Sequence, residues 1–457
     1  MRQSEVDMTK AIQTYIINLD KRPDRKAHVL NEFSRRDEFI VHIITAVENK
    51  IGSIGLWQSI RNILQDTTND AAEFIIICED DHIFTSEYSR KLLSLSIAEA
   101  EEKNADILLG GVSWFSNAIQ VSPRLFWVEK FSGLQFSIIF KRFFQVMLAA
   151  DFNERDAADL KICSLTENKF FIHPFMSIQR EFGYSDATVN NNIEGRVSTL
   201  FEVSNEKMRI LRKATKYYIN RKADSSIIDA KVIEKIKIPT YITDNPGSVS
   251  RETQIRKEFK SRKEFDIINS QTNRDGSKTS VLWSSIIDAV QQAVRNEDDV
   301  IIICKRGHVF TSWYSKYFLI TQILKAHSLG CSILCGGVGD FNLMIPLTTH
   351  LYWIDAFQSA QFIVVFKRLF DIVLNEPFSD SDMFDCKLSE MTSHKMVIHP
   401  FISVGGKPAY SSINQGSHPN GGANFFAKSS DRIENIRRIS DKYKSQNNKT
   451  IVCSRND

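Results

Sequence analysis

The sequence predicts two tandem α/β domains, each built on a mainly parallel, Rossmann-like sheet. Three observations lead to this fold class. The chain has 457 residues, which is more than one hydrophobic core usually covers. Strand and helix patterns alternate along its first half. The same patterns return in the second half at a constant spacing of 226 positions, as from Ile75 to Ile301 (301 − 75).

The elements of the first half can be followed in order from the N-terminus. Continuous apolar runs bounded by turn residues predict buried strands, whereas apolar residues that recur with a helical period predict helices. Strands are expected at 13–19, 39–45, 73–78 and 105–110. Helices are expected at 24–36, 53–66, 88–103 and 141–150, with aromatic-rich extended segments before the last of them.

The repeat is clearest in the segments Leu125–Phe144 and Leu351–Phe370. These match at 9 of 20 positions, where unrelated sequences would match at about one. Such self-similarity predicts a tandem duplication, and each copy of roughly 210 residues is large enough to have its own core. The predicted division is a first domain at 1–225, a linker at 226–237 and a second domain at 238–457.

Composition excludes several classes of protein. An apolar content of 42% with 25% charged residues is typical of globular proteins, not of disordered or fibrous ones. A net charge of +3 without a basic stripe excludes nucleic acid as the favoured partner. The seven cysteines lie mostly in apolar runs and form no Cys-x-x-Cys pair, which indicates reduced core residues instead of zinc ligands or disulfides.

The hydropathy pattern predicts a cytoplasmic protein. Met1–Gln13 is polar and lacks the apolar core of a signal peptide, and no run is long enough to span a membrane. A helix expected at Asn205–Tyr218, with an N-cap at Ser204 or Asn205, has a basic face. This face is either ordinary solvated surface or a peripheral contact with the inner face of a membrane. Its basic residues are Lys207, Arg209, Arg212, Lys213 and Lys216.

Three consecutive acids follow the most apolar predicted strand. Glu79, Asp80 and Asp81 come directly after Ile75–Cys78, and carboxylates cannot share the apolar environment of a buried strand. They are therefore expected at the edge where the strand leaves the sheet, which is where open α/β sheets bind ligands. Clustered carboxylate oxygens there suit Mg²⁺ or Mn²⁺ bridging to phosphates. The alternative is a solvated acidic turn.

Comparison of the two copies separates residues of the fold from candidate functional residues. Glu79-Asp80-Asp81 becomes Lys305-Arg306-Gly307, so a formal charge of −3 becomes +2, and a divalent cation could not be held there. By contrast, His82 and His173 recur in the second copy, which favours structural roles for both.

Other polar segments change together with the acids. Loss of one ligand site from an intact scaffold would produce this pattern, although independent surface drift is the alternative. The changed segments are Asn18–Arg22, which becomes Asp244–Ser248, Ser132-Gly133, which becomes Gln358-Ser359, and Gln179–Asp186, which becomes Gly405–Ser412.

The first copy resembles the family 25 glycosyltransferases, which include lipopolysaccharide-biosynthesis enzymes and collagen galactosyltransferases. The resemblance rests on Ile16–Arg25, on Gly52–Ile60 and on the strand that ends in Glu79-Asp80-Asp81. Within the second motif, Leu56 and Ile60 stand where the family usually has cysteine and histidine. The second copy resembles the family mainly through its likeness to the first.

The resemblance implies a GT-A fold and inverting transfer of a hexose from a nucleotide-sugar donor, in particular a UDP-sugar. The acceptor would be a glycan or another hydroxyl, in the synthesis of a surface polysaccharide or glycoconjugate. Asp81 and Glu79 would hold Mn²⁺ or Mg²⁺ against the donor's diphosphate. The candidate nucleotide-sugar-binding residues are Asn18, Asp20, Arg22, Arg25, Ser59, Asp80, Gly133 and Gln179.

Inverting transfer also requires a carboxylate that takes the proton of the acceptor hydroxyl. Asp186 and Glu181 are the preferred candidates, because both are lost in the second copy. Asp159 is the third, although its survival as Asp385 favours a helix-capping role. The competing hypothesis is a non-catalytic protein that binds carbohydrate or nucleotide-sugar, or serves as a scaffold. The sequence contains no signal for an oligomeric state.

Overall fold

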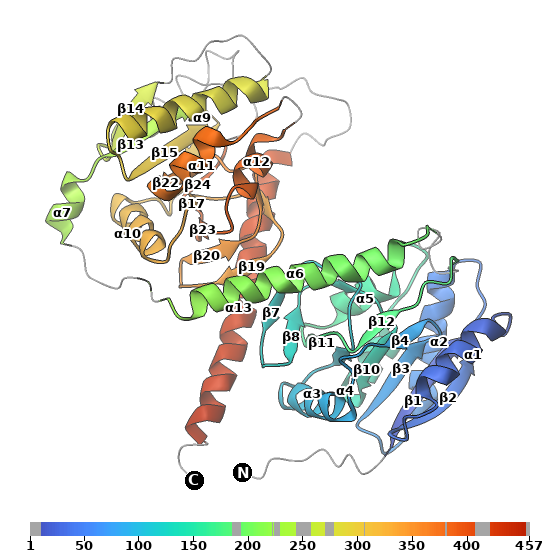
Figure 1. Cartoon of the computed structure of the whole chain (residues 1–457). Coiled ribbons are helices and arrows are strands. Elements are labelled where there is room, and N and C mark those ends of the chain that lie inside the picture. Colours follow the sequence, from blue (N-terminus) through green and yellow to red (C-terminus); the bar gives the residue numbers. More distant parts are fainter. Residues whose placement is uncertain are drawn as a thin grey trace. The chain divides into compact units, whose positions relative to one another are not determined.

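The computed structural model describes residues 11–184, 193–221, 223, 229–243, 257–269, 278–305, 307–379, 382–406 and 421–453. The chain divides into two compact units, Met1–Arg209 (unit 1) and Ile210–Asp457 (unit 2). Each unit contains an eight-stranded mixed sheet with helices packed against it (Figure 1). The predicted fold class of two tandem Rossmann-like α/β domains is therefore confirmed.

The sheet of unit 1 has the strand order β2-β1-β3-β10-β5-β11-β8-β7. Strands β10 and β8 run opposite to the other six, so the sheet is parallel in most of its strands although β10 separates β3 from β5. The bounds are β1 (Ile12–Asn18), β2 (Phe39–Thr45), β3 (Phe74–Glu79), β5 (Ile107–Leu109), β7 (Ala118–Gln120), β8 (Leu125–Val128), β10 (Phe136–Phe140) and β11 (Lys169–Ile172).

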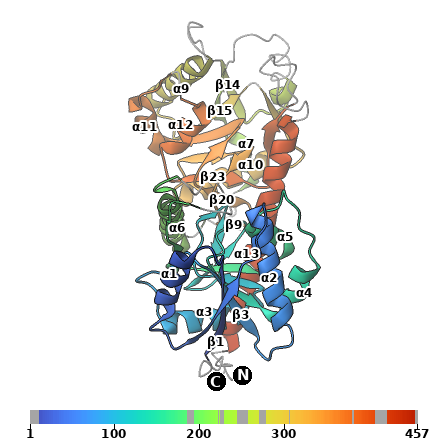
Figure 2. The ribbon, with the colours of Figure 1, turned by 90° about the vertical axis from the view of Figure 1, so that its right-hand side faces the viewer.

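Helices cover both faces of this sheet. Figure 2 shows α1 and α3 on one side of it and α2, α4 and α5 on the other. The apolar strand residues between the two helical layers are buried, as the continuous runs predict. The helices are α1 (Pro23–Phe33), α2 (Gly52–Thr67), α3 (Arg90–Glu102), α4 (Lys141–Ala149), α5 (Ala158–Leu165) and α6 (Arg196–Ile219). Two short ribbons complete the unit, β4 (His82–Phe84) with β12 (Ser177–Gln179) and β6 (Trp114–Phe115) with β9 (Phe131–Ser132).

Unit 2 repeats the strand order and directions of unit 1, as β14-β13-β15-β22-β17-β23-β20-β19. The register is also the same, since Thr14 pairs with Ile76 and Thr240 with Ile302. The sheet strands are β13 (Ile238–Thr243), β14 (Phe265–Asn269), β15 (Val300–Lys305), β17 (Ile333–Cys335), β19 (Met344–Pro346), β20 (Leu351–Ile354), β22 (Phe362–Phe366) and β23 (Lys395–Ile398).

The ribbons and helices of unit 2 follow the same plan. The ribbons are β16 (His308–Phe310) with β24 (Ser403–Gly405) and β18 (Asp340–Phe341) with β21 (Phe357–Gln358). The helices are α7 (Ala230–Lys235), α9 (Lys278–Arg295), α10 (Lys316–Ser328), α11 (Phe370–Asn375), α12 (Phe384–Glu390) and α13 (Gly421–Cys453), with a 3-10 turn, η2, at Lys367–Leu369.

The predicted start of the helix at Ser204 or Asn205 is wrong. Helix α6 already begins at Arg196, and Ser204 lies within it, where its buried hydroxyl donates to the Ser113 carbonyl at 2.8 Å. A serine that satisfies its hydroxyl through a neighbouring loop does not need to cap a helix. The basic face is also partly engaged, because Lys207 donates to the Phe115 carbonyl at 2.6 Å. Among the described helices, none is long and apolar enough to cross a membrane.

Candidate functional site

The candidate site lies at the carboxyl edge of the sheet of unit 1. Strands β1 and β3 are neighbours and parallel, so the turns that follow them meet at one edge. The loop after β2 joins them there, and a cavity of about 190 Å³ opens between the three segments. Basic and acidic side chains share its wall, namely Lys21, Arg22, Arg25, Glu48, Lys50, Glu79, Asp80 and Asp81.

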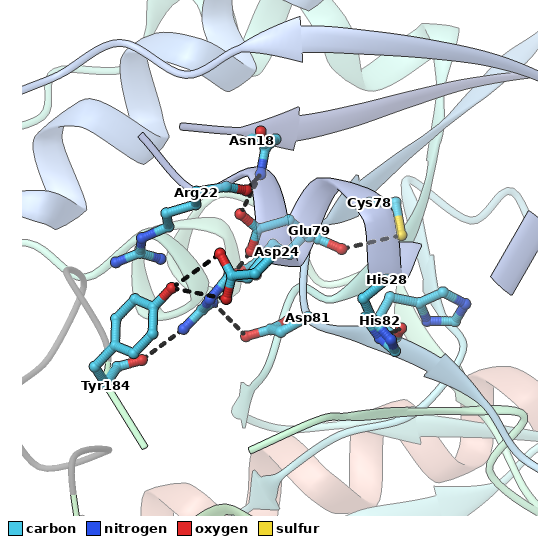
Figure 3. A network of polar contacts seen from close by, with 11 residues as sticks. Asn18, Arg22, Asp24, His28, Cys78, Glu79, Asp81, His82 and Tyr184 are labelled. Atoms are coloured by element: carbon cyan, nitrogen blue, oxygen red, sulfur yellow. Dashed lines mark hydrogen bonds and ion pairs between the residues drawn. The ribbon is translucent and has the colours of Figure 1, made fainter. Parts of the chain in front are cut away.

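Asp80 is buried and fully engaged within the protein. Arg25 donates to its Oδ1 at 3.1 Å, and Asn18 donates to its Oδ2 at 2.9 Å (Figure 3). The Arg25 side chain is itself only 6% exposed, so this is a buried, charge-assisted pair. Asp80 and Asn18, both predicted to contact the nucleotide-sugar, join the ends of β1 and β3 through this hydrogen bond, and their contact with a nucleotide-sugar stays a prediction.

Asp81 and Glu79 are acids whose surroundings disfavour their ionised forms, although Arg25 Nη1 lies 3.6 Å from Asp81 Oδ2. Burial raises the pKa of Asp81 to about 7, with a further contribution from Asp80, against the opposing effects of Arg25 and a hydrogen bond from Gln179. Its Oδ1 atom is buried without a hydrogen-bond partner among the described residues. Burial also raises the pKa of Glu79 well above its usual range, and Asp81, Asp80 and Asp159 add to the shift. Both carboxyl groups would gain from a cation.

The donor set can be tested against the predicted Mg²⁺ or Mn²⁺. Among the described residues, no cluster of three or more His, Cys, Asp or Glu side chains is arranged to hold a metal ion. Magnesium, however, commonly binds proteins through one or two carboxylates and completes its shell with water and substrate phosphates. The unpartnered oxygen of Asp81 and the neighbouring Glu79 fit that mode. The residues present thus fit a divalent cation whose coordination is completed by water and by the phosphates of a bound substrate.

An aromatic segment covers the arginines beside the acids. The backbone of Arg180 donates to the Asp81 carbonyl at 2.6 Å, which places Phe182 and Tyr184 next to Arg25. Tyr184 accepts a bond from Arg25 at its carbonyl at 2.5 Å, and its ring also lies 4.7 Å from the Arg22 guanidinium. The pairing of these aromatics with arginines joins segments far apart in the sequence and therefore depends on the fold.

Ser59 and Asp20 occupy supporting positions. Ser59 is buried, and its hydroxyl accepts from the Val47 backbone and donates to the Gly55 carbonyl, both at 2.8 Å. Since Val47 lines the cavity, Ser59 positions the cavity wall. Asp20 is exposed and accepts from Thr45 at 3.1 Å, outside the set of residues that line the cavity.

Of the two predicted bases that lie in the described part of the chain, Asp159 is the one whose charge acts on the acid cluster. It sits in the first turn of α5, where its carboxylate accepts from Ser132 and from the Leu160 backbone. Ala157, and not Asp159, is the N-cap residue of α5, although Asp159 does satisfy the Leu160 amide in the first turn of the helix. Its negative charge acts on Glu79.

Glu181, Asp186 and Gly133 are the remaining predicted site residues. Glu181 has a buried Oε1 without a hydrogen-bond partner among the described residues, whereas Asp186 lies outside that set. Gly133 has a φ of +108°, and a Cβ there would lie 2.8 Å from the Gln135 side-chain oxygen. The backbone conformation at position 133 therefore requires a glycine.

The corresponding place in unit 2 is chemically different. Lys305, which replaces Glu79, contacts the Asp385 carboxylate at 2.6 Å, and Asp385 also accepts from the Ser359 backbone at 2.9 Å. The two histidines that follow the strand ends keep the same role in both units. His82 and His308 are buried and share hydrogen bonds with serine hydroxyls at 2.8 and 2.6 Å.

Comparisons with known proteins give only distant similarities. No family model and no curated protein sequence matches the chain. Two structures of UDP-glucose pyrophosphorylase, one apo and one complexed with UDP-glucose, are 9% and 8% identical, with a TM-score of 0.27. Each alignment covers 45% of this chain and 85% of the other. The glycosyltransferase GlyE of Streptococcus pneumoniae TIGR4 is 6% identical, with a TM-score of 0.25, over 65% of this chain and 91% of its own. TM-scores this low assign the chain to neither class.

Proposed function

We propose that the chain is a metal-dependent, inverting glycosyltransferase of the family 25 type, which moves a hexose from a nucleotide-sugar, in particular a UDP-sugar, to a hydroxyl acceptor. In this proposal the chain is a tandem duplication, with an active first copy in the predicted domain 1–225 and a degenerate second copy in 238–457. The single observation behind it is that Glu79, Asp80 and Asp81 all line one cavity at the end of β3, where Arg25 contacts Asp80 at 3.1 Å and Asp81 at 3.6 Å.

The cavity combines the charges that a nucleoside diphosphate requires. Lys21, Arg22 and Lys50 line the cavity and would supply positive charge for phosphate oxygens. Asp81 and Glu79 line the same cavity and would hold the divalent cation, which when bound would neutralise charge on the diphosphate leaving group. The Asp80–Arg25 pair keeps the two acids in place.

Asp159 is proposed as the base that takes the acceptor proton. Its negative charge acts on Glu79, and its carboxylate is oriented by the Ser132 hydroxyl. Retention of Asp385 in unit 2 is compatible with this role, because there the carboxylate is consumed by the ion pair with Lys305. In this proposal Asp385, the equivalent of the base in the second copy, is retained as the partner of Lys305 and no longer takes a proton.

The proposal is tested by incubating the full chain with Mn²⁺ and a panel of UDP- and GDP-sugars and measuring nucleotide release. We expect slow release with one donor, and its loss by at least about a hundredfold in Asp81→Asn, as for loss of a metal-held charge in a catalytic site. Asp37→Asn, which removes a 93% exposed carboxylate elsewhere, is the matched control. Unchanged release in Asp81→Asn would refute the metal site.

The competing hypothesis is a non-catalytic protein that binds nucleotide-sugar or carbohydrate. The same cavity and cations would serve it, so binding alone does not separate the two. Donor binding by titration calorimetry together with no nucleotide release, in the presence of Mn²⁺ and varied acceptors, would favour the binding protein.

A further inference from the structure

Trp114 is an exposed aromatic residue in a segment that is otherwise buried. Its neighbours Val112, Ser113 and Phe115 are all buried, whereas Trp114 itself is 38% exposed. Large aromatic side chains dominate the energetics of core packing and of binding surfaces. A single exposed aromatic side chain is common on protein surfaces, so the residues around Trp114 decide whether it can contact a ligand.

The position of Trp114 relates it to the proposed base. In the β6–β9 ribbon, Trp114 pairs directly with Ser132. Side chains of directly opposite residues in an antiparallel pair project from the same face and lie next to each other. Ser132 in turn donates its hydroxyl to Asp159. The indole consequently flanks the hydroxyl that orients the base.

The indole is also supported from one side. Lys207 of α6 donates to the Phe115 carbonyl at 2.6 Å, which fixes its ammonium group, and this group lies 5.6 Å from the centre of a Trp114 ring. A cation held near an aromatic face restricts the ring's orientation. The ring is thus positioned before any ligand binds.

Unit 2 shows that the ribbon does not need this tryptophan. The equivalent ribbon pairs Asp340 with Gln358, and its buried residues Phe341 and Phe357 correspond to Phe115 and Phe131 of unit 1. The buried pair is therefore kept, and only the outward pair has changed. The outward pair of unit 1 is best explained by a ligand that unit 2 does not bind.

We infer that Trp114 is the platform on which a sugar ring of the acceptor stacks, so that the acceptor is a saccharide and not a protein or lipid hydroxyl. This inference rests on the proposed function. The apolar C–H face of a pyranose packs on an indole, while its hydroxyls reach the polar groups at the platform's edge. Ser132 and Asp159 are those groups here.

The transfer step then balances as follows. The acceptor hydroxyl loses its proton to the Asp159 carboxylate, and its oxygen forms a bond to the anomeric carbon of the donor sugar. The bond from that carbon to the diphosphate oxygen breaks, and its electron pair leaves with the nucleoside diphosphate. Trp114 touches the acceptor alone, and its removal leaves donor binding intact.

The experiment compares the full-length wild-type chain with Trp114→Ala and Trp114→Phe in two assays. The first is binding to an array of saccharides, with hydroxylated peptides and hydroxylated lipids as the other probes. The second is nucleotide release with Mn²⁺ and donor, with and without each probe. Trp313→Ala removes a tryptophan that is 62% exposed in unit 2 and is the matched control.

Binding of a saccharide and its stimulation of release should fall about tenfold in Trp114→Ala and recover to within about threefold in Trp114→Phe, while release without acceptor stays unchanged. Equal saccharide binding by wild type and Trp114→Ala overturns the platform. So does stimulation by peptide or lipid alone, or the absence of any saccharide binding by the wild type. Trp114-dependent saccharide binding without release from any donor supports the platform and refutes only the proposed transferase.

Discussion

Lys305 and Asp385 form a 2.6 Å ion pair in unit 2 at the positions that correspond to Glu79 and Asp159 in unit 1. The two equivalent positions therefore carry two carboxylates in unit 1 and a pair of opposite charges in unit 2. In unit 1 the pKa of Glu79 is raised well above its usual range, by burial first and then by its acidic neighbours. The repulsion is a cost that a bound cation would offset.

Glu79→Lys should convert the site of unit 1 into the arrangement of unit 2. The introduced ammonium group can pair with Asp159, so we expect the free energy of unfolding to stay within about 1 kcal/mol of wild type. Nucleotide release from the donor should be lost. Chemical unfolding and the release assay, performed on the same preparation, measure both.

The control for this substitution is Glu79→Gln, which removes the charge without adding a cation. It should also weaken release, but Mn²⁺ titration should show intermediate affinity between wild type and Glu79→Lys. Wild-type release in Glu79→Lys would contradict the assignment of Glu79 to the cation site.

The acids at the end of β3 could be predicted from the sequence, but their partners could not. The apolar run Ile75–Cys78 followed by carboxylates is a local pattern, and the structure buries the run. Arg25, by contrast, precedes Asp80 by 55 positions, and Tyr184 follows Arg25 by 159. Only the order of strands in the sheet brings them together, and this order depends on packing between distant segments.

Local patterns also misled where a polar residue had two possible uses. Ser204 has the residue type of an N-cap, yet its hydroxyl bonds to Ser113 from within α6. Asp159 likewise suited a cap, but its carboxylate accepts from Ser132 in another segment. For Ser204 a tertiary hydrogen bond replaces a local one, whereas Asp159 makes both kinds, since it also accepts from the Leu160 backbone, and the sequence does not distinguish these uses.

Arg25→Met should destabilise unit 1, because it leaves the buried Asp80 carboxylate without its cation. The expected loss is about 3 kcal/mol in the free energy of unfolding. The double variant with Asp80→Asn should recover only part of this loss, since Asp80 then carries no unpaired charge but Asp81 still lacks the guanidinium that lies 3.6 Å from it in the wild type. A double-mutant cycle measured by urea unfolding gives the coupling, and strict additivity of the two losses would show that the pair is not coupled.

Ser59→Ala should weaken donor binding without affecting the chemical step. The substitution removes the bond to the Val47 backbone at the cavity wall, at a cost of about 1 kcal/mol. The KM for the donor should then rise roughly fivefold with kcat unchanged. Ser285→Ala is the control, because Ser285 is the equivalent buried serine of unit 2 and donates to Val281 at 2.9 Å. A similar rise in KM for Ser285→Ala would indicate a general loss of stability.

His308→Gln should reduce the acid sensitivity of the protein. Burial, together with the charge of Arg262, lowers the pKa of His308 to about 3 from its ordinary 6.5. Between these values the unfolded chain binds more protons than the folded one, so stability is complete above about pH 6.5 and falls as the pH drops toward 3. The wild type should lose about 1.4 kcal/mol per pH unit from this group, and the variant should not.

Urea unfolding at intervals from pH 7 to pH 4.5 measures this difference. His327→Gln, at an exposed histidine of the same unit, should keep the wild-type pH dependence. Because the Nδ1 of His308 shares a hydrogen bond with Ser403, the glutamine variant should start from somewhat lower stability at pH 7. The two stability curves should therefore converge as the pH falls, and curves that stay parallel would show that His308 is not the titrating group.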